Sequence, residues 1–290
     1  MTKVDKIAWD HYSSLNEIHR LQRVNPFIRF NCNIKDDLTP NYNKDLNIGV
    51  VIGTYGGLSP YIKLQLYYLK EINKIDNILV VDDYSDERNQ LANYCKQLNI
   101  DFASTPIHLP YIKNVGSNGD TYCFYKGLQW AKEHNIDILV KLSKRLIPQF
   151  NWKSNFIELI HQTDALTYSS YCIKDRFNFR TECVGMDVNS WSHFLNVMNF
   201  YLSQHYIIFA EYWFHELAKT LSFYNKSKKW SEYQNTLQYD KSGYAHWYDI
   251  LGDDRYSTSR RHDGVLWHMY NTEEDYINCL KKLNIENIKN

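Results

Sequence analysis

Two sets of polar residues follow apolar segments of this chain and carry the side chains that nucleotide binding needs. The first set follows the apolar run 48–52, and the second follows the run 78–81. A carboxylate can accept hydrogen bonds from a nucleobase or a ribose, and a tyrosine ring can stack on a base. The alternative is that each set only ends a strand and caps a helix. The candidate nucleotide-binding residues are Gly53, Thr54, Tyr55, Asp82 and Asp83.

The elements that must position these residues alternate between strand and helix. Apolar runs predict buried strands at 48–52, 78–81 and 136–142, with a shorter strand at 100–103. This alternation is typical of an α/β, Rossmann-like fold with a mostly parallel sheet and helices on both faces. Because ligands bind beyond the carboxyl ends of such strands, the two polar sets should share one edge. The intervening helices are expected at 60–72, at 85–98 with Ser85 as its N-cap, and at 121–134.

The second half of the chain is less regular. Its predicted strands are 166–171 and 183–188, its predicted helices are 191–202, 207–224 and 273–283, and 226–263 is expected to be rich in loops. We divide the chain into a helical N-terminal extension, 1–45, and a single domain, 46–290. The domain has a nucleotide-binding half, 46–148, and an acceptor-binding half, 149–290.

The bulk composition narrows the class of protein. The 290 residues are 44% hydrophobic and carry no net charge, which argues against nucleic acid as a partner. The six cysteines are scattered without a C-x-x-C pair, which favours a reducing cytoplasm. The sequence has no apolar N-terminal core typical of a signal peptide, and no apolar run reaches the roughly 18 residues that a membrane span needs. Any association with a membrane is therefore expected to be peripheral. An aromatic content of 16% fits either core filling or sugar binding.

The spacing of the two polar sets resembles the nucleotide-binding half of glycosyltransferases with the GT-A fold, especially the inverting family 2. Gly53-Thr-Tyr55 is followed about 27 residues later by Val80-Val-Asp-Asp-Tyr-Ser-Asp86. The resemblance covers about 48–148 and implies that Tyr55 and Asp83 hold the base of a nucleotide-sugar donor. It further implies transfer of a sugar to a glycan, polysaccharide or lipid-linked glycan acceptor.

The chain departs from this family at the end of its third long strand. The family has D-x-D or D-D there, and these carboxylates hold a divalent metal ion against the donor diphosphate. Here the residues are basic, and Arg and Lys can bind phosphate directly. We therefore predict a site without a metal and without any cofactor besides the donor. The candidate phosphate-binding residues are Lys141, Ser143, Lys144, Arg145 and, in a late basic segment that could close as a lid, His268.

Inverting transfer also requires a general base for the acceptor hydroxyl. In the resembled family this is an acidic residue at the start of a late helix, which makes Glu211 the first candidate and Asp187 the second. The main alternative is a catalytically inactive GT-A-like scaffold that binds a nucleotide or a glycan. A homo-oligomer is left open. A sugar-phosphate nucleotidyltransferase is disfavoured by the short glycine loop 53–57, and an oxidoreductase by the lack of G-x-G-x-x-G.

Overall fold

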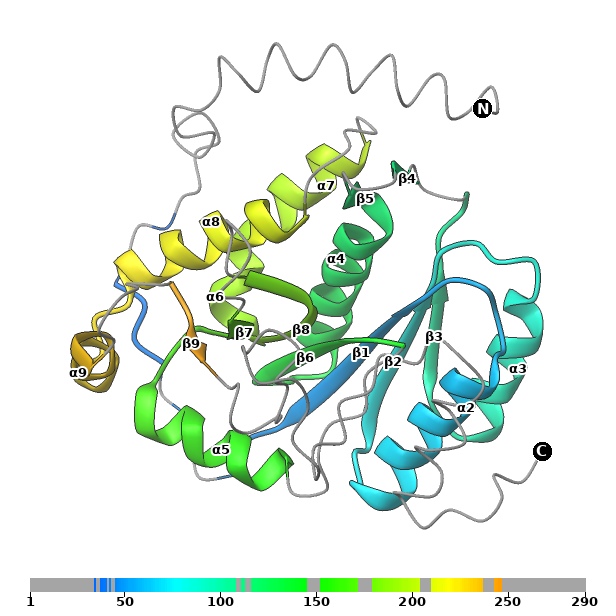
Figure 1. Cartoon of the computed structure of the whole chain (residues 1–290), viewed down its shortest axis with the longest axis horizontal. Coiled ribbons are helices and arrows are strands. Elements are labelled where there is room, and N and C mark those ends of the chain that lie inside the picture. Colours follow the sequence, from blue (N-terminus) through cyan, green and yellow to red (C-terminus); the bar gives the residue numbers. More distant parts are fainter. Residues whose placement is uncertain are drawn as a thin grey trace, which may run out of the picture.

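The protein is an α/β domain built on a seven-stranded sheet of order β3-β2-β1-β6-β8-β7-β9 (Figure 1). The computed structural model describes residues 34, 37–40, 42, 45–107, 111–112, 116–144, 152–171, 179–203, 210–236 and 243–246. Four strands at one side are mutually parallel: β1 (Ile48–Thr54), β2 (Asn77–Asp82), β3 (Asp101–Ser104) and β6 (Ile138–Ser143). The remaining three are β8 (Phe179–Asp187), antiparallel to β6 and to β7 (Thr167–Tyr171), and β9 (Ala245–His246), parallel to β7.

The helices cover both faces of this sheet, because its central strands are apolar on both sides. Along β1, Val51 belongs to one core cluster while Val50 and Ile52 belong to the other. The first face carries α4 (Asn118–Glu133), α6 (Val188–Trp191), α7 (Leu195–Ser203) and α8 (Ala210–Tyr224). The second carries α2 (Pro60–Tyr67), α3 (Arg88–Gln97), α5 (Trp152–Thr163) and α9 (Lys228–Thr236). The predicted α/β class with a mostly parallel sheet is confirmed.

Several element predictions needed correction. Helix α3 begins at Arg88, because Ser85 bonds to Asp82 instead of capping the helix. The helix expected at 191–202 is split into α6, a 3-10 turn (Ser192–Phe194) and α7. Part of the segment expected to be loops forms α9, and a π-helical turn (Tyr68–Ile72) continues α2. A small separate ribbon pairs β4 (Tyr111–Ile112) with β5 (Gly116–Ser117).

The described residues of the predicted N-terminal extension pack on the domain. Ile34 and Leu38 join the core cluster on the α8 face, and Leu38 pairs with Asn225 just beyond α8. The expected helix in this extension and the closing helix 273–283 lie outside the described residues. Within the described part of the chain, no helix is both long and apolar enough to cross a membrane.

The strand directions define two edges of the sheet. The carboxyl edge is the edge at which β1, β2, β3 and β6 end, and the amino edge is the one at which they begin. Helix α8 ends at the amino edge, since Asn225, the next residue, bonds to Asp164, which precedes β7. Near the start of α8, the ring of Phe214 stacks on Phe124 with centroids 3.9 Å apart. Phe124 in turn lies 5.3 Å from Lys141 Nζ, near the end of β6, so α8 begins toward the carboxyl edge.

Candidate active site

The loop after β1 places a tyrosine side chain and two glycines at the carboxyl edge. Gly56 and Gly57 have φ angles of 98° and 65°, a region that side chains disfavour. A Cβ atom on Gly57 would lie 2.4 Å from the Cβ atom of Glu87, so no larger residue fits there. Tyr55, which enters this loop, is 56% exposed. The loop therefore brings backbone close to the surface beside an accessible aromatic ring.

The end of β2 uses its two aspartates differently. Asp82 is fully buried, and its carboxylate accepts hydrogen bonds from the backbone N–H (2.7 Å) and the hydroxyl (3.0 Å) of Ser85. It therefore shapes the turn that begins the next loop. Asp83 lies beside the β1 end, where its N–H donates to the Thr54 carbonyl, and its carboxylate accepts from the Thr105 hydroxyl at 3.2 Å. Of the two, Asp83 is the one placed to contact a ligand at the edge.

Tyr84, which follows Asp83, was not predicted from the sequence as part of the site. It has a φ angle of 51°, which is strained for a residue with a side chain, and it is 39% exposed. The guanidinium of Arg88 stacks over its ring at 4.1 Å, a cation–π contact. From the sequence, Arg88 is expected only as part of the helix 85–98, and Tyr84 has no predicted role.

The basic residues at the end of β6 do not form the predicted cluster. Lys141 is only 1% exposed, and its ammonium group donates to Asp120 Oδ1 at 2.7 Å and to the Thr181 carbonyl at 2.6 Å. Lys141, a predicted phosphate-binding residue, is thus paired inside the protein and not exposed at the strand end. Ser143 lies opposite Gly53, with its backbone carbonyl bonded to Gln65 Nε2.

Lys144 remains beside the glycine loop. Its ammonium group contacts the carbonyl oxygen of Tyr55, and a Cβ atom on Gly56 would lie 3.4 Å from its Nζ. The structure therefore brings Lys144 together with Tyr55 and the loop that follows it. Arg145 and His268 lie outside the described residues.

The two candidate bases lie at opposite edges. Glu211 is in the first turn of α8, toward the carboxyl edge. Asp187 ends β8 opposite Ile138, at the amino edge, where it caps α6 by accepting from Ser190 N–H at 2.7 Å. Burial raises the pKa of Asp187, and the Tyr42 hydroxyl donates to it. Asp187, the second candidate base, therefore lies at the edge opposite the nucleotide-binding candidates.

An open hollow of about 310 Å³ lies elsewhere, between the sheet and the second half of α4. Its lining includes Phe102, Lys126 and Trp130 and none of the predicted site residues. It sits beside β3, where Asp101 accepts from the indole N–H of Trp130 at 2.7 Å. The residues with nucleotide-binding chemistry are therefore at the strand ends and not in this hollow.

Comparison with known proteins gives structural matches only. No family model and no curated protein matches the chain. A cytidylyltransferase from Leptospira borgpetersenii is similar in structure, with 13% identity and a TM-score of 0.43 over 83% of this chain and 94% of that one. A mannosyltransferase from Pyrobaculum calidifontis, in complex with GDP-Man and Mn²⁺, shows 12% identity and a TM-score of 0.40 over 76% and 64%.

A further match is glucosyl-3-phosphoglycerate synthase from Mycobacterium tuberculosis, in complex with Mn²⁺, UDP and its product. It shows 12% identity and a TM-score of 0.36 over 53% of this chain and 64% of that one. This chain therefore spans slightly under two thirds of the length of the synthase and of the mannosyltransferase. The likeness to GT-A transferases that the sequence predicted recurs among these solved structures.

These structures also correct the prediction of a site that needs no metal, which was wrong. Two of the similar proteins hold Mn²⁺ together with their nucleotide, and Lys141, one of the cations meant to replace that ion, is already neutralised. Across the ranges that the structure describes, no group of three or more His, Cys, Asp and Glu side chains could hold a metal ion. The described His, Cys, Asp and Glu side chains therefore do not form a metal centre by themselves.

Proposed function

We propose that this protein is a glycosyltransferase that moves a sugar from a nucleotide-sugar donor to a glycan or lipid-linked glycan. The observation that carries the proposal is that Tyr55 and Asp83 directly follow Thr54 and Asp82, the paired ends of β1 and β2 at the carboxyl edge. An exposed ring can stack on a base, and the adjacent carboxylate can accept its N–H groups. Thr54 supports the same site, because its hydroxyl is buried and has no hydrogen-bond partner among the described residues.

The phosphates of the donor would lie against the glycine loop. Gly56 and Gly57 allow the close approach of backbone N–H groups, and the ammonium group of Lys144 lies at the same loop. A positive charge there stabilises the negative charge that develops on the departing phosphate oxygen. Ser143 at the end of β6 and Arg145 beyond it are retained as further candidates for this subsite.

The transfer would be a single displacement that inverts the anomeric carbon. The acceptor hydroxyl oxygen forms a bond to that carbon, and its proton passes to Glu211, which lies on the helix that begins toward the same edge. The bond from carbon to phosphate oxygen breaks, and its electron pair leaves with the nucleotide. His268 is proposed to approach the phosphates from the later basic segment.

The cytoplasm is the proposed compartment, because the thiols of Cys95 and Cys123 are buried without disulfides. A second candidate function, a nucleotide- or glycan-binding scaffold without catalysis, is favoured by Ser143 and Lys144. They occupy the end of β6, where carboxylates would be expected for a catalytic metal.

Calorimetry with UDP, GDP, CMP and dTDP, each with and without Mn²⁺, tests the nucleotide site. We expect at least one nucleotide to bind, with affinity falling about tenfold or more in Tyr55→Ala, since stacking of a base on an aromatic ring contributes about 1–3 kcal/mol. Asp83→Asn should weaken binding and alter which nucleotide is preferred. Phe223→Ala, which removes another exposed ring from the far end of α8, is the matched control.

If all four nucleotides fail to bind, or if Tyr55→Ala and Phe223→Ala behave alike, the proposed site is wrong. Binding followed by transfer of labelled sugar to an extracted glycan acceptor distinguishes the enzyme from the scaffold. A scaffold would bind the donor and transfer nothing under any metal condition.

A further inference from the structure

We propose that Asp120, held in place by the buried ammonium group of Lys141, binds hydroxyl groups of the donor sugar. The inference rests on the proposed nucleotide-sugar donor and adds the part of the site that recognises the sugar. Asp120 lies in the first turn of α4, and Lys141 lies near the end of β6. Asp120 would touch the substrate, whereas Lys141 would be a positioning residue.

Lys141 is committed to the interior. Only 1% of its side chain is exposed, its Nζ lies 2.7 Å from Asp120 Oδ1, and it sits 5.3 Å above the ring of Phe124. A Cβ atom at Gly53 would crowd Cys123 Sγ at 3.1 Å and would lie in ordinary contact with Lys141 Cε at 3.9 Å, so β1 packs directly against the buried lysine. A buried ammonium group needs such a partner, since an unpaired charge in the interior is strongly unfavourable.

Asp120 is exposed on the other side of the same ion pair. Its side chain is 39% exposed, against 1% for Lys141, so the carboxylate keeps a face toward solvent. Its second oxygen lies 3.4 Å from the Thr181 hydroxyl, which is at the outer limit of a hydrogen bond. A carboxylate has about four acceptor positions, so these contacts leave capacity for a ligand.

The contacts of Asp120 place it at the carboxyl edge. Thr181 lies two residues before Cys183 on β8, and Cys183 pairs with Leu142 near the end of β6. Because β8 runs antiparallel to β6, Thr181 lies beyond the end of β6 at the carboxyl edge. Asp120 is therefore tied to the edge at which Tyr55 and Asp83 also lie.

The electrostatics favour a neutral hydroxyl-bearing ligand next to phosphates. An isolated carboxylate would repel a diphosphate, but the ammonium group of Lys141 cancels its charge at 2.7 Å. The carboxylate still accepts charge-assisted hydrogen bonds, which are stronger than neutral ones. Sugar hydroxyls are the donors of the proposed substrate that suit this acceptor.

The test compares each nucleotide with its own sugar conjugate: UDP with UDP-glucose, GDP with GDP-mannose, and CMP with CMP-sialic acid. The measured quantity is the ratio of the Kd of the nucleotide to the Kd of the conjugate. We expect Asp120→Asn to lower this ratio about tenfold or more for the conjugate that the wild type prefers, while the Kd of the free nucleotide changes little.

The double variant Asp120→Asn/Lys141→Met guards against a folding defect, because it removes both charges of the buried pair together. It should lower the ratio as much as the single variant does. Lys141→Met alone keeps the carboxylate but removes its partner, so the ratio should fall and free nucleotide should bind more weakly at low salt. Asp101→Asn is the control, since Asp101 is a partly exposed carboxylate on β3 that bonds to Trp130.

Donor analogues that lack single hydroxyls sharpen the result. For the wild type, one analogue should bind about tenfold more weakly than the full conjugate. For Asp120→Asn, the same analogue and the full conjugate should bind with equal affinity. An unchanged ratio in both Asp120 variants, or an equal fall in Asp101→Asn, would overturn the inference while leaving nucleotide binding intact. If the wild type binds no nucleotide, the proposed function itself fails and the inference fails with it.

Discussion

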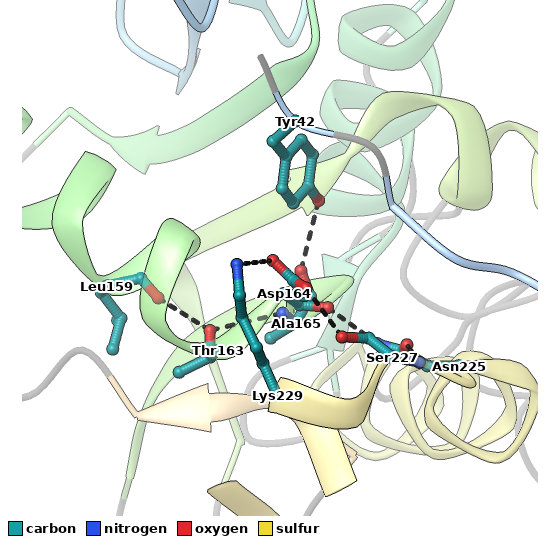
Figure 2. A network of polar contacts seen from close by, with 8 residues as sticks. All are labelled: Tyr42, Leu159, Thr163, Asp164, Ala165, Asn225, Ser227 and Lys229. Atoms are coloured by element: carbon teal, nitrogen blue, oxygen red, sulfur yellow. Dashed lines mark hydrogen bonds and ion pairs between the residues drawn. The ribbon is translucent and has the colours of Figure 1, made fainter. Parts of the chain in front are cut away.

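The two edges of the sheet differ in how completely their polar groups are paired. At the amino edge, Asp164 accepts from Ser227 Oγ at 2.7 Å and from Lys229 Nζ at 3.3 Å, and its backbone carbonyl accepts from Asn225 at 2.8 Å (Figure 2). At the carboxyl edge, the buried Thr54 hydroxyl has no partner among the described residues, and Tyr55 and Asp120 face solvent. A closed network contributes to stability, whereas open polar groups beside a strained loop are suited to binding.

Figure 2 shows how many chain segments the amino-edge network joins. The Tyr42 hydroxyl donates to the Ala165 carbonyl, and Thr163 Oγ1 accepts from Ala165 N–H and donates to the Leu159 carbonyl. Tyr42 of the N-terminal extension, the end of α5 and the start of α9 are thus held together. Substitutions at this edge should therefore alter folding and leave ligand binding unchanged, while substitutions of exposed side chains at the open edge, such as Tyr55, should do the reverse.

The largest effect is expected from Glu211→Gln. If Glu211 is the base, kcat should fall by about 10²–10⁴-fold, with little change in donor Kd, because the variant cannot take the acceptor proton. Asp187→Asn is the matched control at the other edge and should keep full kcat. Steady-state rates of sugar transfer measure both, and equal losses in the two variants would contradict the assignment of roles to the edges.

Lys141→Ala should be the most destabilising of the changes considered. It removes one member of a buried ion pair, a change that typically costs about 3–5 kcal/mol, and the lower end is expected because Asp120 stays partly solvated. Urea denaturation followed by circular dichroism measures the loss. The double variant Asp120→Asn/Lys141→Met should recover part of the lost stability. If Lys141→Ala were as stable as the wild type, the ion pair would not be formed.

Asp164→Ala should lower the free energy of unfolding by about 2–3 kcal/mol without changing nucleotide affinity. It leaves Ser227 and Lys229 without their acceptor, and it places alanine at a φ angle of 49°. Asp164→Asn is a milder control, because asparagine tolerates that φ angle. Chemical denaturation and nucleotide titration should be run on the same samples. Weakened nucleotide binding in the folded variant would argue against independent edges.

The smallest effect concerns the pH dependence of Asp187. Burial is the largest cause of its raised pKa, so the folded state favours the protonated carboxyl. This contribution to stability is present below the ordinary pKa of 3.8 and is lost as the pH rises through the higher folded value. Asp187→Asn should therefore be as stable as wild type below the ordinary pKa of the carboxyl and more stable than wild type at pH 7. Thermal unfolding of both proteins across this pH range measures the difference. A variant that became less stable than the wild type as the pH rose would contradict this prediction.

The sequence predicted much of the parallel part of the fold. Continuous apolar runs mark β1, β2 and β6 because each of these strands is buried on both faces. Pro60 marks the start of α2 for a similarly local reason, since its fixed φ angle suits the first helical position. The sequence did not predict α9, a short and mostly polar helix, nor the break between α6 and α7.

The position of Tyr55 and Asp83 next to each other could also be inferred from the sequence, because parallel strands bring their carboxyl ends to one edge. Only the tertiary structure decided where Lys141, Asp120 and Asp187 lie and which groups they contact. A lysine at the end of a strand looks the same in sequence whether it faces a ligand or a buried aspartate 21 residues away. The direction of β8, which places Asp187 at the opposite edge, depends on antiparallel pairing with β6. Charge and spacing are local properties, whereas burial and strand direction arise only when distant segments pack together.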